Sequence, residues 1–200
     1  MKTGERVVVF IDGGNLYSGV KEGLHLQKSV KVDGLAEKLA AGRPLVRIYY
    51  YTTPSPRPDS PKGKAHQRFL DKLGWIDYLQ VRLGRLVPRE VQIDCQNCGE
   101  KQTFRSHIQK GVDTRIVVDM VTMAVRDSYD TAILVSGDSD LAEAVNFIRE
   151  HTNKQVENAC VPGKGWAKTL REAADKRISL TKEYLSDCLL EAPLEEQAPF

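Results

Sequence analysis

Acidic side chains follow two short apolar segments of this chain at the point where each segment ends. Asp12 comes directly after Val7–Ile11. Asp138 and Asp140 follow Thr131–Val135. Short apolar runs that stop at a cluster of Gly, Asp and Ser are typical of buried parallel strands. Because ligands bind beyond the carboxyl ends of the strands in open α/β sheets, we expect these acids to share one edge of a sheet.

A third acidic position, Asp113, opens a segment with helical spacing. On a helical wheel, Asp113 falls on the apolar side with Val117 and Met120, and Asp119 lies at the edge of that side. Acids on or beside an apolar face are uncommon unless they are paired or bind a metal. The structural alternatives are a helix cap for Asp113 and an ion pair with an arginine for Asp119.

The acids at the strand ends also have a purely structural explanation. Asp and Asn are favoured helix N-caps, which suits Asp12 and Asn15. Acids in the first turn of a helix complement its dipole, which suits Asp138 and Asp140. A single acid is enough for a cap, so the two acids that flank Ser139 exceed that requirement.

Clustered carboxylates indicate a particular chemistry. Carboxylates held close together repel one another, and a divalent cation relieves that repulsion. Mg²⁺ and Mn²⁺ prefer oxygen ligands and keep water in their coordination shell. Such an ion acidifies bound water and stabilises charge on a phosphate during in-line displacement. A protein base is then unnecessary, and no histidine stands where it would serve these acids as one.

The elements that must position these acids alternate between strand and helix. We expect strands at 6–11, 45–52, 78–86, 131–135 and 155–161, and helices at 15–21, 33–41, 64–73, 112–126, 141–150, 166–174 and 181–190. This order predicts an α/β fold with a mostly parallel sheet of about five strands and helices on both faces. The 53–63 segment, rich in Pro and Ser, is expected to be a loop, and the tail from Glu191 is expected to fray.

Composition is that of an ordinary soluble domain. The chain has 200 residues, of which 41% are hydrophobic and 28% charged, enough for one α/β domain. We expect that domain at 1–180, followed by a helix and acidic tail at 181–200. The net charge is +2, but the tail is acidic, so the first 180 residues carry +6. This balance permits a polyanionic partner. Without a membrane-spanning or signal segment, we expect a cytoplasmic protein.

A separate metal signal lies in the insert at 87–111, a polar segment without clear periodicity. Cys95 and Cys98 form a Cys-x-x-Cys-Gly knuckle, which is half of a zinc ribbon. His107 is a candidate third ligand, and Cys160, Cys188 or a second subunit would supply the fourth. The alternative is a reduced pair of cysteines in a turn. If zinc binds, we expect it to fold the insert and to take no part in catalysis.

Three segments of the chain resemble the NYN domain family, the LabA-like branch of the PIN-like nucleases. They are Phe10–Leu16, Lys110–Asp113 with Asp119 downstream, and Ser136–Leu141. Their order and spacing match over about residues 6–180. The resemblance implies a Rossmann-like, PIN-type α/β fold and a magnesium- or manganese-dependent ribonuclease site.

The resemblance carries over to particular positions. The implied metal-binding and catalytic acids are Asp12, Asp113, Asp138 and Asp140. Asn15 and Asp119 take supporting positions, and Ser136 adds a hydroxyl at a strand end. Gly13 and Gly14 stand where family members commonly have other residues after the first Asp.

Basic and aromatic side chains offer candidate RNA contacts. They are Lys62, Lys64, Arg68, Lys110, Lys164, Trp166, Lys168 and Arg171. Lys164 and Trp166 belong to Pro-Gly-Lys-Gly-Trp, directly after the 155–161 strand, where Trp166 is suited to stack on a base. The alternative is a turn that places Trp166 in the core. PIN-like folds often dimerise, so a homodimer is a candidate assembly, with the aromatic run Tyr49–Tyr51 at its interface or, equally, in a central strand.

Two functions compete on this evidence. The first is a metal-dependent endoribonuclease that hydrolyses RNA phosphodiesters through a carboxylate-bound Mg or Mn site. The alternative is a catalytically silent module that binds RNA or a protein partner through the same acidic crevice. A small-molecule phosphohydrolase ranks last, because Asp12-Gly-Gly-Asn15 lacks the second Asp of an aspartyl-phosphate motif.

Overall fold

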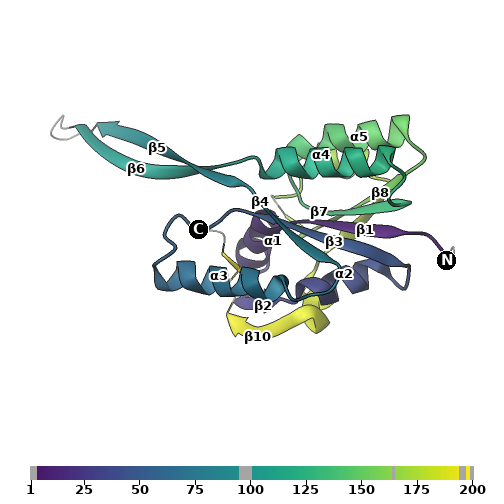
Figure 1. Cartoon of the computed structure of the whole chain (residues 1–200), viewed down its shortest axis with the longest axis horizontal. Coiled ribbons are helices and arrows are strands. Elements are labelled where there is room, and N and C mark those ends of the chain that lie inside the picture. Colours follow the sequence, from purple (N-terminus) through teal and green to yellow (C-terminus); the bar gives the residue numbers. More distant parts are fainter. Residues whose placement is uncertain (1–3, 95–100, 164, 194–196, 199–200) are drawn as a thin grey trace.

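A parallel sheet forms the centre of the molecule (Figure 1). The computed structural model describes residues 4–94, 101–163, 165–193 and 197–198. Within them, six strands lie in the order β4-β3-β1-β7-β8-β9, and every neighbouring pair is parallel. Their bounds are β1 Val7–Asp12, β3 Leu45–Thr52, β4 Leu79–Leu83, β7 Thr131–Val135, β8 Gln155–Cys160 and β9 Lys176–Ser179. The expected parallel α/β fold is confirmed, with β9 as an additional strand.

Helices cover both faces of this sheet, with α4 and α5 over one face and α2 and α3 over the other (Figure 1). Short π or 3₁₀ turns extend three of the connections, at η1 Gly19–Gly23, η2 Ser139–Leu141 and η3 Ser186–Cys188. The α-helices are α1 Gly13–Ser18, α2 Val32–Ala40, α3 Pro61–Leu73, α4 Val112–Val125, α5 Ala142–His151, α6 Lys168–Ala173 and α7 Lys182–Leu185.

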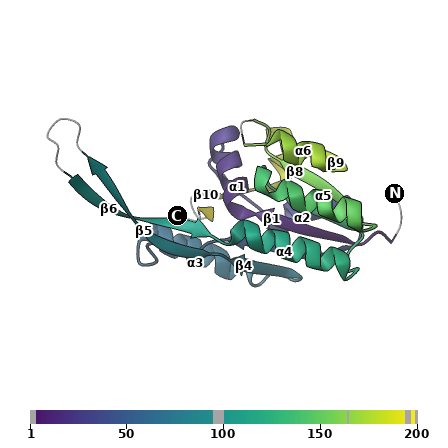
Figure 2. The same ribbon diagram turned by 90° about the horizontal axis from the view of Figure 1, so that it is seen from above.

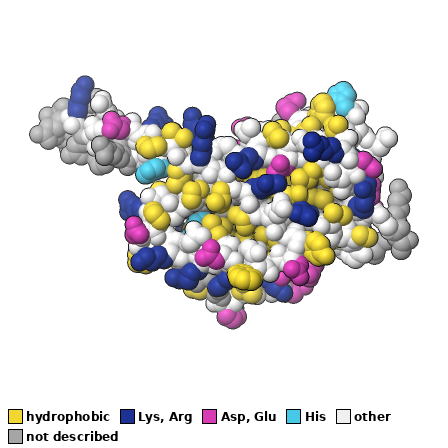
Figure 3. Space-filling model, viewed as in Figure 1, with side chains coloured by type: hydrophobic (Ala, Val, Ile, Leu, Met, Phe, Trp, Pro, Cys, Tyr) yellow, Lys and Arg dark blue, Asp and Glu magenta, His cyan; other side chains and the backbone are white. Residues whose placement is uncertain are grey.

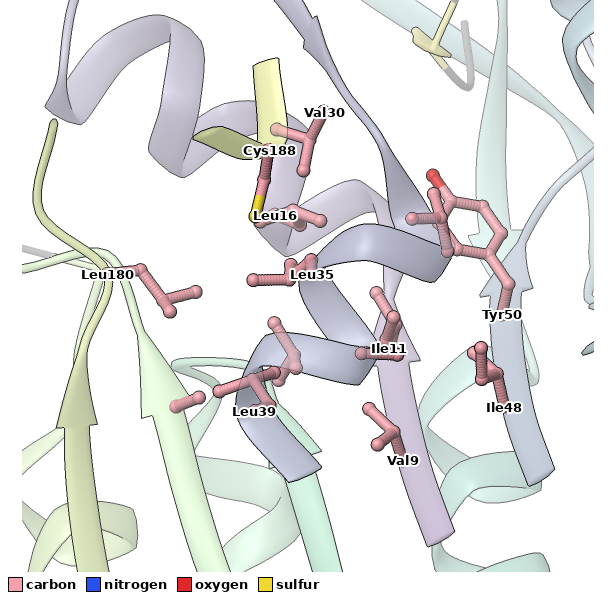
Figure 4. Close-up of a cluster of buried hydrophobic side chains, with 14 of the residues drawn as sticks. Val9, Ile11, Leu16, Val30, Leu35, Leu39, Ile48, Tyr50, Leu180 and Cys188 are labelled. Carbon is pink, nitrogen blue, oxygen red and sulfur yellow. The ribbon is translucent and has the colours of Figure 1, made fainter. Parts of the chain in front are cut away.

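Strand β1 explains why its sequence is a continuous apolar run. Val9 and Ile11 enter the core under α2, whereas Val8 and Phe10 enter the core under α4. A strand with helices on both faces needs apolar side chains at every position. Figure 4 shows Val9 and Ile11 facing the side chains of α2. Because β1 lies between β3 and β7, its carboxyl end is held at the middle of the sheet edge.

The aromatic strand β3 fills both cores. Tyr49 and Tyr51 belong to the core under α4, and Tyr50 belongs to the opposite core. The rings of Tyr49 and Phe10 stack with their centroids 5.6 Å apart, and Tyr50 meets Phe69 edge-on at 5.7 Å. Packing within the domain therefore accounts for the burial of the three tyrosines.

The polar insert at 87–111, which shows no clear periodicity, forms most of an antiparallel hairpin. Strands β5 Arg85–Asp94 and β6 Lys101–Lys110 pair from Arg85↔Lys110 to Asp94↔Lys101. The hairpin projects away from the sheet (Figures 1 and 2). Much of it is exposed on both faces, so its sequence lacks the apolar and polar alternation of a half-buried strand. For that reason neither strand of the hairpin was predicted over its full length.

The C-terminal segment is part of the fold, contrary to the expected long helix and frayed tail. Thr181 caps α7, because its Oγ1 accepts a hydrogen bond from the Tyr184 N–H at 3.2 Å. After η3, strand β10 Leu189–Pro193 pairs antiparallel with β2 Lys28–Val30. The buried Gln197 amide donates to the Val30 carbonyl at 2.7 Å and accepts from the Val30 N–H at 3.1 Å. The Gln197 side-chain amide thus makes with Val30 the two hydrogen bonds that a peptide group of a neighbouring strand would make.

No helix in the described ranges has both the length and the apolar character needed to cross a membrane.

Candidate active site

Two neighbouring strands deliver polar side chains to one edge of the sheet. Strands β1 and β7 pair in parallel register up to Ile11↔Val135, so the residues that follow them meet at the same edge. Asp12 is buried there and is the N-cap of α1. One carboxylate oxygen accepts from the Asn15 N–H at 3.1 Å, and the other accepts from the Ser136 hydroxyl, also at 3.1 Å.

Hydrogen bonds fix the loop after β7 against α1. The Gly137 N–H donates to the Asn15 side-chain oxygen at 2.9 Å. The Asp138 N–H donates to Ser136 Oγ at 3.2 Å, and the Asp138 carboxylate accepts from the Asp140 N–H at 3.0 Å. Asn15 and Ser136 therefore position the loop that carries the acids.

The acids line a pocket of about 280 Å³ at this edge. Asp12 comes from the end of β1, Asp138 from the loop after β7 and Asp113 from the first turn of α4. Asp140 is exposed and does not line the pocket. Lys110 lies on its wall, and Gly111, with φ of 84°, makes the left-handed turn from β6 into α4 that sets Asp113 in place.

The carboxylates in this pocket interact electrostatically. Burial raises the pKa of Asp12 to about 6; hydrogen bonds from Asn15 and Ser136 oppose the rise, and the charges of Asp113 and Asp138 add to it. Loss of solvation also raises the pKa of Asp113, and the charges of Asp138 and Asp140 raise it further. At neutral pH the pocket therefore concentrates negative charge that the nearby protein groups only partly offset.

Asp119 lies in a different environment from the other acids. Its carboxylate accepts a hydrogen bond from the Tyr51 hydroxyl at 2.8 Å, and Arg82 Nε lies 3.6 Å away. It lines a separate pocket of about 480 Å³ with Val8 and Thr122. The supporting role expected for Asp119 at the acidic pocket does not fit this position, which matches the alternative of an acid paired with an arginine.

Comparison with known proteins identifies the family to which this geometry belongs. The family model for the NYN domain matches residues 6–182. The chain belongs to the NYN domain family. Members of this family are generally nucleases.

One curated relative and one solved structure resemble this NYN domain over most of its length. The Low amplitude and bright protein LabA of Synechococcus elongatus (strain ATCC 33912 / PCC 7942 / FACHB-805) is 29% identical over 177 residues, covering 88% of this chain and 83% of that protein. A crystal structure of a protein of unknown function from Vibrio parahaemolyticus RIMD 2210633 has a TM-score of 0.62 at 23% identity. The match covers 95% of this chain and 99% of that one, and it shows a shared fold.

Close backbone approach at two glycines shapes the site of this NYN domain. A Cβ atom at Gly13 would lie 2.5 Å from the Tyr50 ring, so the glycine lets α1 pack on β3. A Cβ atom at Gly137 would lie 1.7 Å from the Gly165 carbonyl oxygen. Gly137 therefore holds the loop after β7 against the loop after β8.

The predicted RNA contacts have different surroundings. Half-buried Trp166 donates through Nε1 to Asn158 Oδ1 at 2.6 Å, and Asn158 Nδ2 donates to the Ser136 carbonyl at 2.8 Å. These hydrogen bonds hold Trp166 against the loop after β7. Its position is therefore close to the alternative in which the turn places Trp166 in the core. Lys168 is exposed and lies 3.6 Å from Glu172. Lys164 lies outside the described residues, and Lys110 lines the acidic pocket.

The predicted zinc site is not assembled from the described residues. Cys95 and Cys98 lie outside them. His107 is exposed on β6, six ladder positions from Lys101, which is about 20 Å along a strand. His107 is thus far from the end of the hairpin that leads into the cysteines, and Cys160 and Cys188 are buried in the body of the domain. Structural zinc, with His107 as its third ligand, stays a prediction.

No metal-binding group of three or more His, Cys, Asp or Glu side chains is formed within the described ranges. Asp12, Asp113 and Asp138 line one pocket without converging on a single point. Their oxygen-only chemistry suits Mg²⁺ or Mn²⁺.

Sequence analysis missed Gln109 as part of the site. Gln109 lines the acidic pocket, and its buried Nε2 has no hydrogen-bond partner within the described residues. Two further pockets adjoin the acidic one: a pocket of about 300 Å³ shares Asn15 and Ser18 with it, and a pocket of about 1030 Å³ shares Gln109. The only local signal for Gln109 was its place directly before Lys110.

Proposed function

We propose that this NYN domain is a metal-dependent endoribonuclease that hydrolyses RNA phosphodiesters at the acidic pocket. The observation that carries the proposal is the meeting of Asp12, Asp113 and Asp138, from three separate segments, in one pocket at the carboxyl edge of the sheet. A site that only bound a polyanion would gain nothing from carboxylates. Membership of a family of generally nuclease-active domains supports the same conclusion.

The residues present fit a hard divalent cation. Asp12, Asp113, Asp138 and Asp140 would hold Mg²⁺ or Mn²⁺, and the raised pKa values of Asp12 and Asp113 indicate charge that a cation would relieve. When bound, such an ion activates water and stabilises charge on the phosphate. Asn15 and Ser136 orient the Asp12 carboxylate.

A positively charged side chain of the protein is also placed to contact the RNA substrate. Lys110 lines the same pocket as the acids and offers a positive charge to an RNA phosphate.

A non-catalytic module that binds RNA or a protein partner is the second candidate function. The acids of the described chain do not converge on one point, which is the observation in its favour. It predicts binding without turnover and no effect of metal on RNA integrity.

Cleavage of a labelled RNA by the purified protein tests the proposal. With Mn²⁺ or Mg²⁺ we expect products, with EDTA none, and with Asp138→Asn a loss of at least about 100-fold in rate. Asp77→Asn, at an exposed position outside the described pockets, is the matched control and should cleave as the wild type does. A folded wild-type protein that cleaves with neither metal would favour the binding module.

A further inference from the structure

A large groove separates the hairpin from the start of α3. Its volume is about 1030 Å³, against about 280 Å³ for the acidic pocket. We call it the hairpin groove. Its lining includes Arg57, Lys62, Leu86, Ser106, Ile108 and Gln109. Gln109 also lines the acidic pocket, so the two spaces adjoin. Figure 3 shows Lys and Arg side chains gathered around the base of the hairpin.

The charge of the hairpin groove is opposite to that of the acidic pocket. No acidic side chain is among its described lining residues, and Arg57 and Lys62 have no carboxylate partner within the described part of the chain. Leu86, which shares a face of the hairpin with its paired residue Gln109, adds an apolar surface. Unpaired cations suit phosphates, and an apolar floor suits the faces of unpaired bases. The volume is at the upper end of small-molecule pockets and exceeds the needs of one phosphate.

The wall that carries Arg57 is preorganised. The Arg57 carbonyl accepts hydrogen bonds from the Ser60 hydroxyl at 2.7 Å and from the Ser60 N–H at 3.1 Å. Ser60 Oγ also accepts from the Gly63 N–H at 2.9 Å, which caps α3. A Cβ atom at Gly63 would lie 2.0 Å from the Arg57 carbonyl oxygen, so the loop and the helix fit tightly. Little ordering of this backbone is then needed on binding.

We propose that the hairpin groove binds the single-stranded RNA segment adjoining the phosphodiester held at the acidic pocket. Arg57 and Lys62 contact its phosphates, Leu86 contacts its bases, and the unpartnered amide of Gln109 donates to the strand between the two sites. The identity of the ligand as RNA rests on the proposed function, but binding in the groove does not require cleavage. A duplex is too wide to lay its bases on this floor.

Binding of a labelled single-stranded RNA of about 12 nucleotides, measured by fluorescence anisotropy in EDTA, tests the groove. Arg57→Ala combined with Lys62→Ala should weaken binding at least about 10-fold and reduce the slope of log K against log salt by about 1.4. Arg126→Ala with Lys182→Ala removes the same charge outside both pockets and should change affinity less than about 2-fold. Equal losses of affinity in the two double variants would overturn the proposal. Tighter binding of a duplex or an acidic peptide than of the single-stranded RNA would also overturn it.

A second arm separates this proposal from the proposed function. With Mn²⁺, the Arg57 and Lys62 double variant should lose kcat/KM on the longer RNA and keep it on a dinucleotide, which is too short to fill the groove. If the wild type cleaves neither substrate, the nuclease proposal fails and the anisotropy result still decides the groove. If the wild type cleaves both and the double variant matches it on both, the groove proposal fails and the nuclease proposal stands.

Discussion

Asp12 caps a helix and lines the acidic pocket with the same carboxylate. One oxygen accepts from the backbone of Asn15, and the other accepts from Ser136. The arrangement has an electrostatic cost, because burial raises the Asp12 pKa from 3.8 to about 6. That shift corresponds to roughly 3 kcal/mol between the two protonation states. The ionised, buried Asp12 carboxylate therefore lowers the stability of the folded domain, a cost that the proposed function would explain.

Asp12→Asn should stabilise the metal-free protein near neutral pH. The folded-state pKa is raised, so the stability contributed by protonated Asp12 is complete below pH about 4 and is lost as pH rises through about 6. Asn keeps the cap and carries no charge. We expect Tm in EDTA to rise by several degrees at neutral pH and to change little at pH about 4. Circular dichroism melts measure this, and a lower Tm at neutral pH would contradict it.

The β5–β6 hairpin and the C-terminal strand β10 are the elements that differ most from the prediction based on the sequence pattern. None of the described side chains between 90 and 105 (90–92, 101 and 103) belongs to either hydrophobic core, and the described part of the outer hairpin is joined by its own ladder. Strand β10 and Gln197, in contrast, complete the hydrogen bonding of β2 from 159 to 167 positions away in the chain. Local contacts therefore stabilise one element, and long-range contacts stabilise the other.

Shortening the hairpin should leave the domain folded. Replacing residues 90–105 by Asn-Gly joins the paired residues Arg89 and Ser106 through a two-residue turn that suits a hairpin. Because the described side chains of this segment lie outside both hydrophobic cores, we expect Tm to change by less than about 5 °C. Thermal denaturation of the full-length and shortened proteins provides the measurement. Loss of the cooperative unfolding transition in the shortened protein would show that the outer hairpin supports the core.

Gln197→Ala should weaken the attachment of the C-terminal segment. The change removes two hydrogen bonds and leaves the N–H and carbonyl of Val30 without their present partners. We expect a loss of about 2–4 kcal/mol in the free energy of unfolding, measured by urea denaturation. Gln27→Ala, at an exposed position, is the control and should change stability by less than about 0.5 kcal/mol. Equal stability of the two variants would mean that this amide pairing contributes nothing.

At the scale of the whole molecule, the acidic pocket joins segments that are far apart in the chain. Asp12 ends β1, whereas Asp113 and Asp138 follow β6 and β7, and the three acids line one pocket only when the sheet has formed. A ligand that binds all three binds the folded state alone. Its binding energy therefore adds to the stability of the entire domain.

Magnesium should raise the Tm of the wild-type protein. At a free concentration of about 100 times Kd, binding to the folded state adds about 2.7 kcal/mol, which is a rise of several degrees for a chain of this size. Asp138→Asn should lose most of the rise, and Asp77→Asn should keep it. Melts in EDTA and in Mg²⁺ measure the difference. An equal rise in all three proteins would place the ion outside the acidic pocket.

Local pattern in the sequence was sufficient for the order of the main elements. The runs Val7–Ile11 and Thr131–Val135 predicted the central strands, because a strand buried on both faces must be apolar at every position. The polar residues after each run predicted where they would meet, because adjacent parallel strands end at one edge. The presence of Asp12 and Asp138 at that edge followed from the sequence alone, and their catalytic role stays a prediction.

Tertiary structure decided the features that depend on contacts between distant residues. Asp119 faces Tyr51 and Arg82 because α4 crosses β3 and β4, and no spacing within α4 reveals that pairing. Gln109 reaches the acidic pocket because the hairpin returns to the start of α4, and Gln197 reaches Val30 across the fold. Apolar periodicity reports which face of an element is buried, but the partner that a polar side chain meets is set by the packing of whole elements.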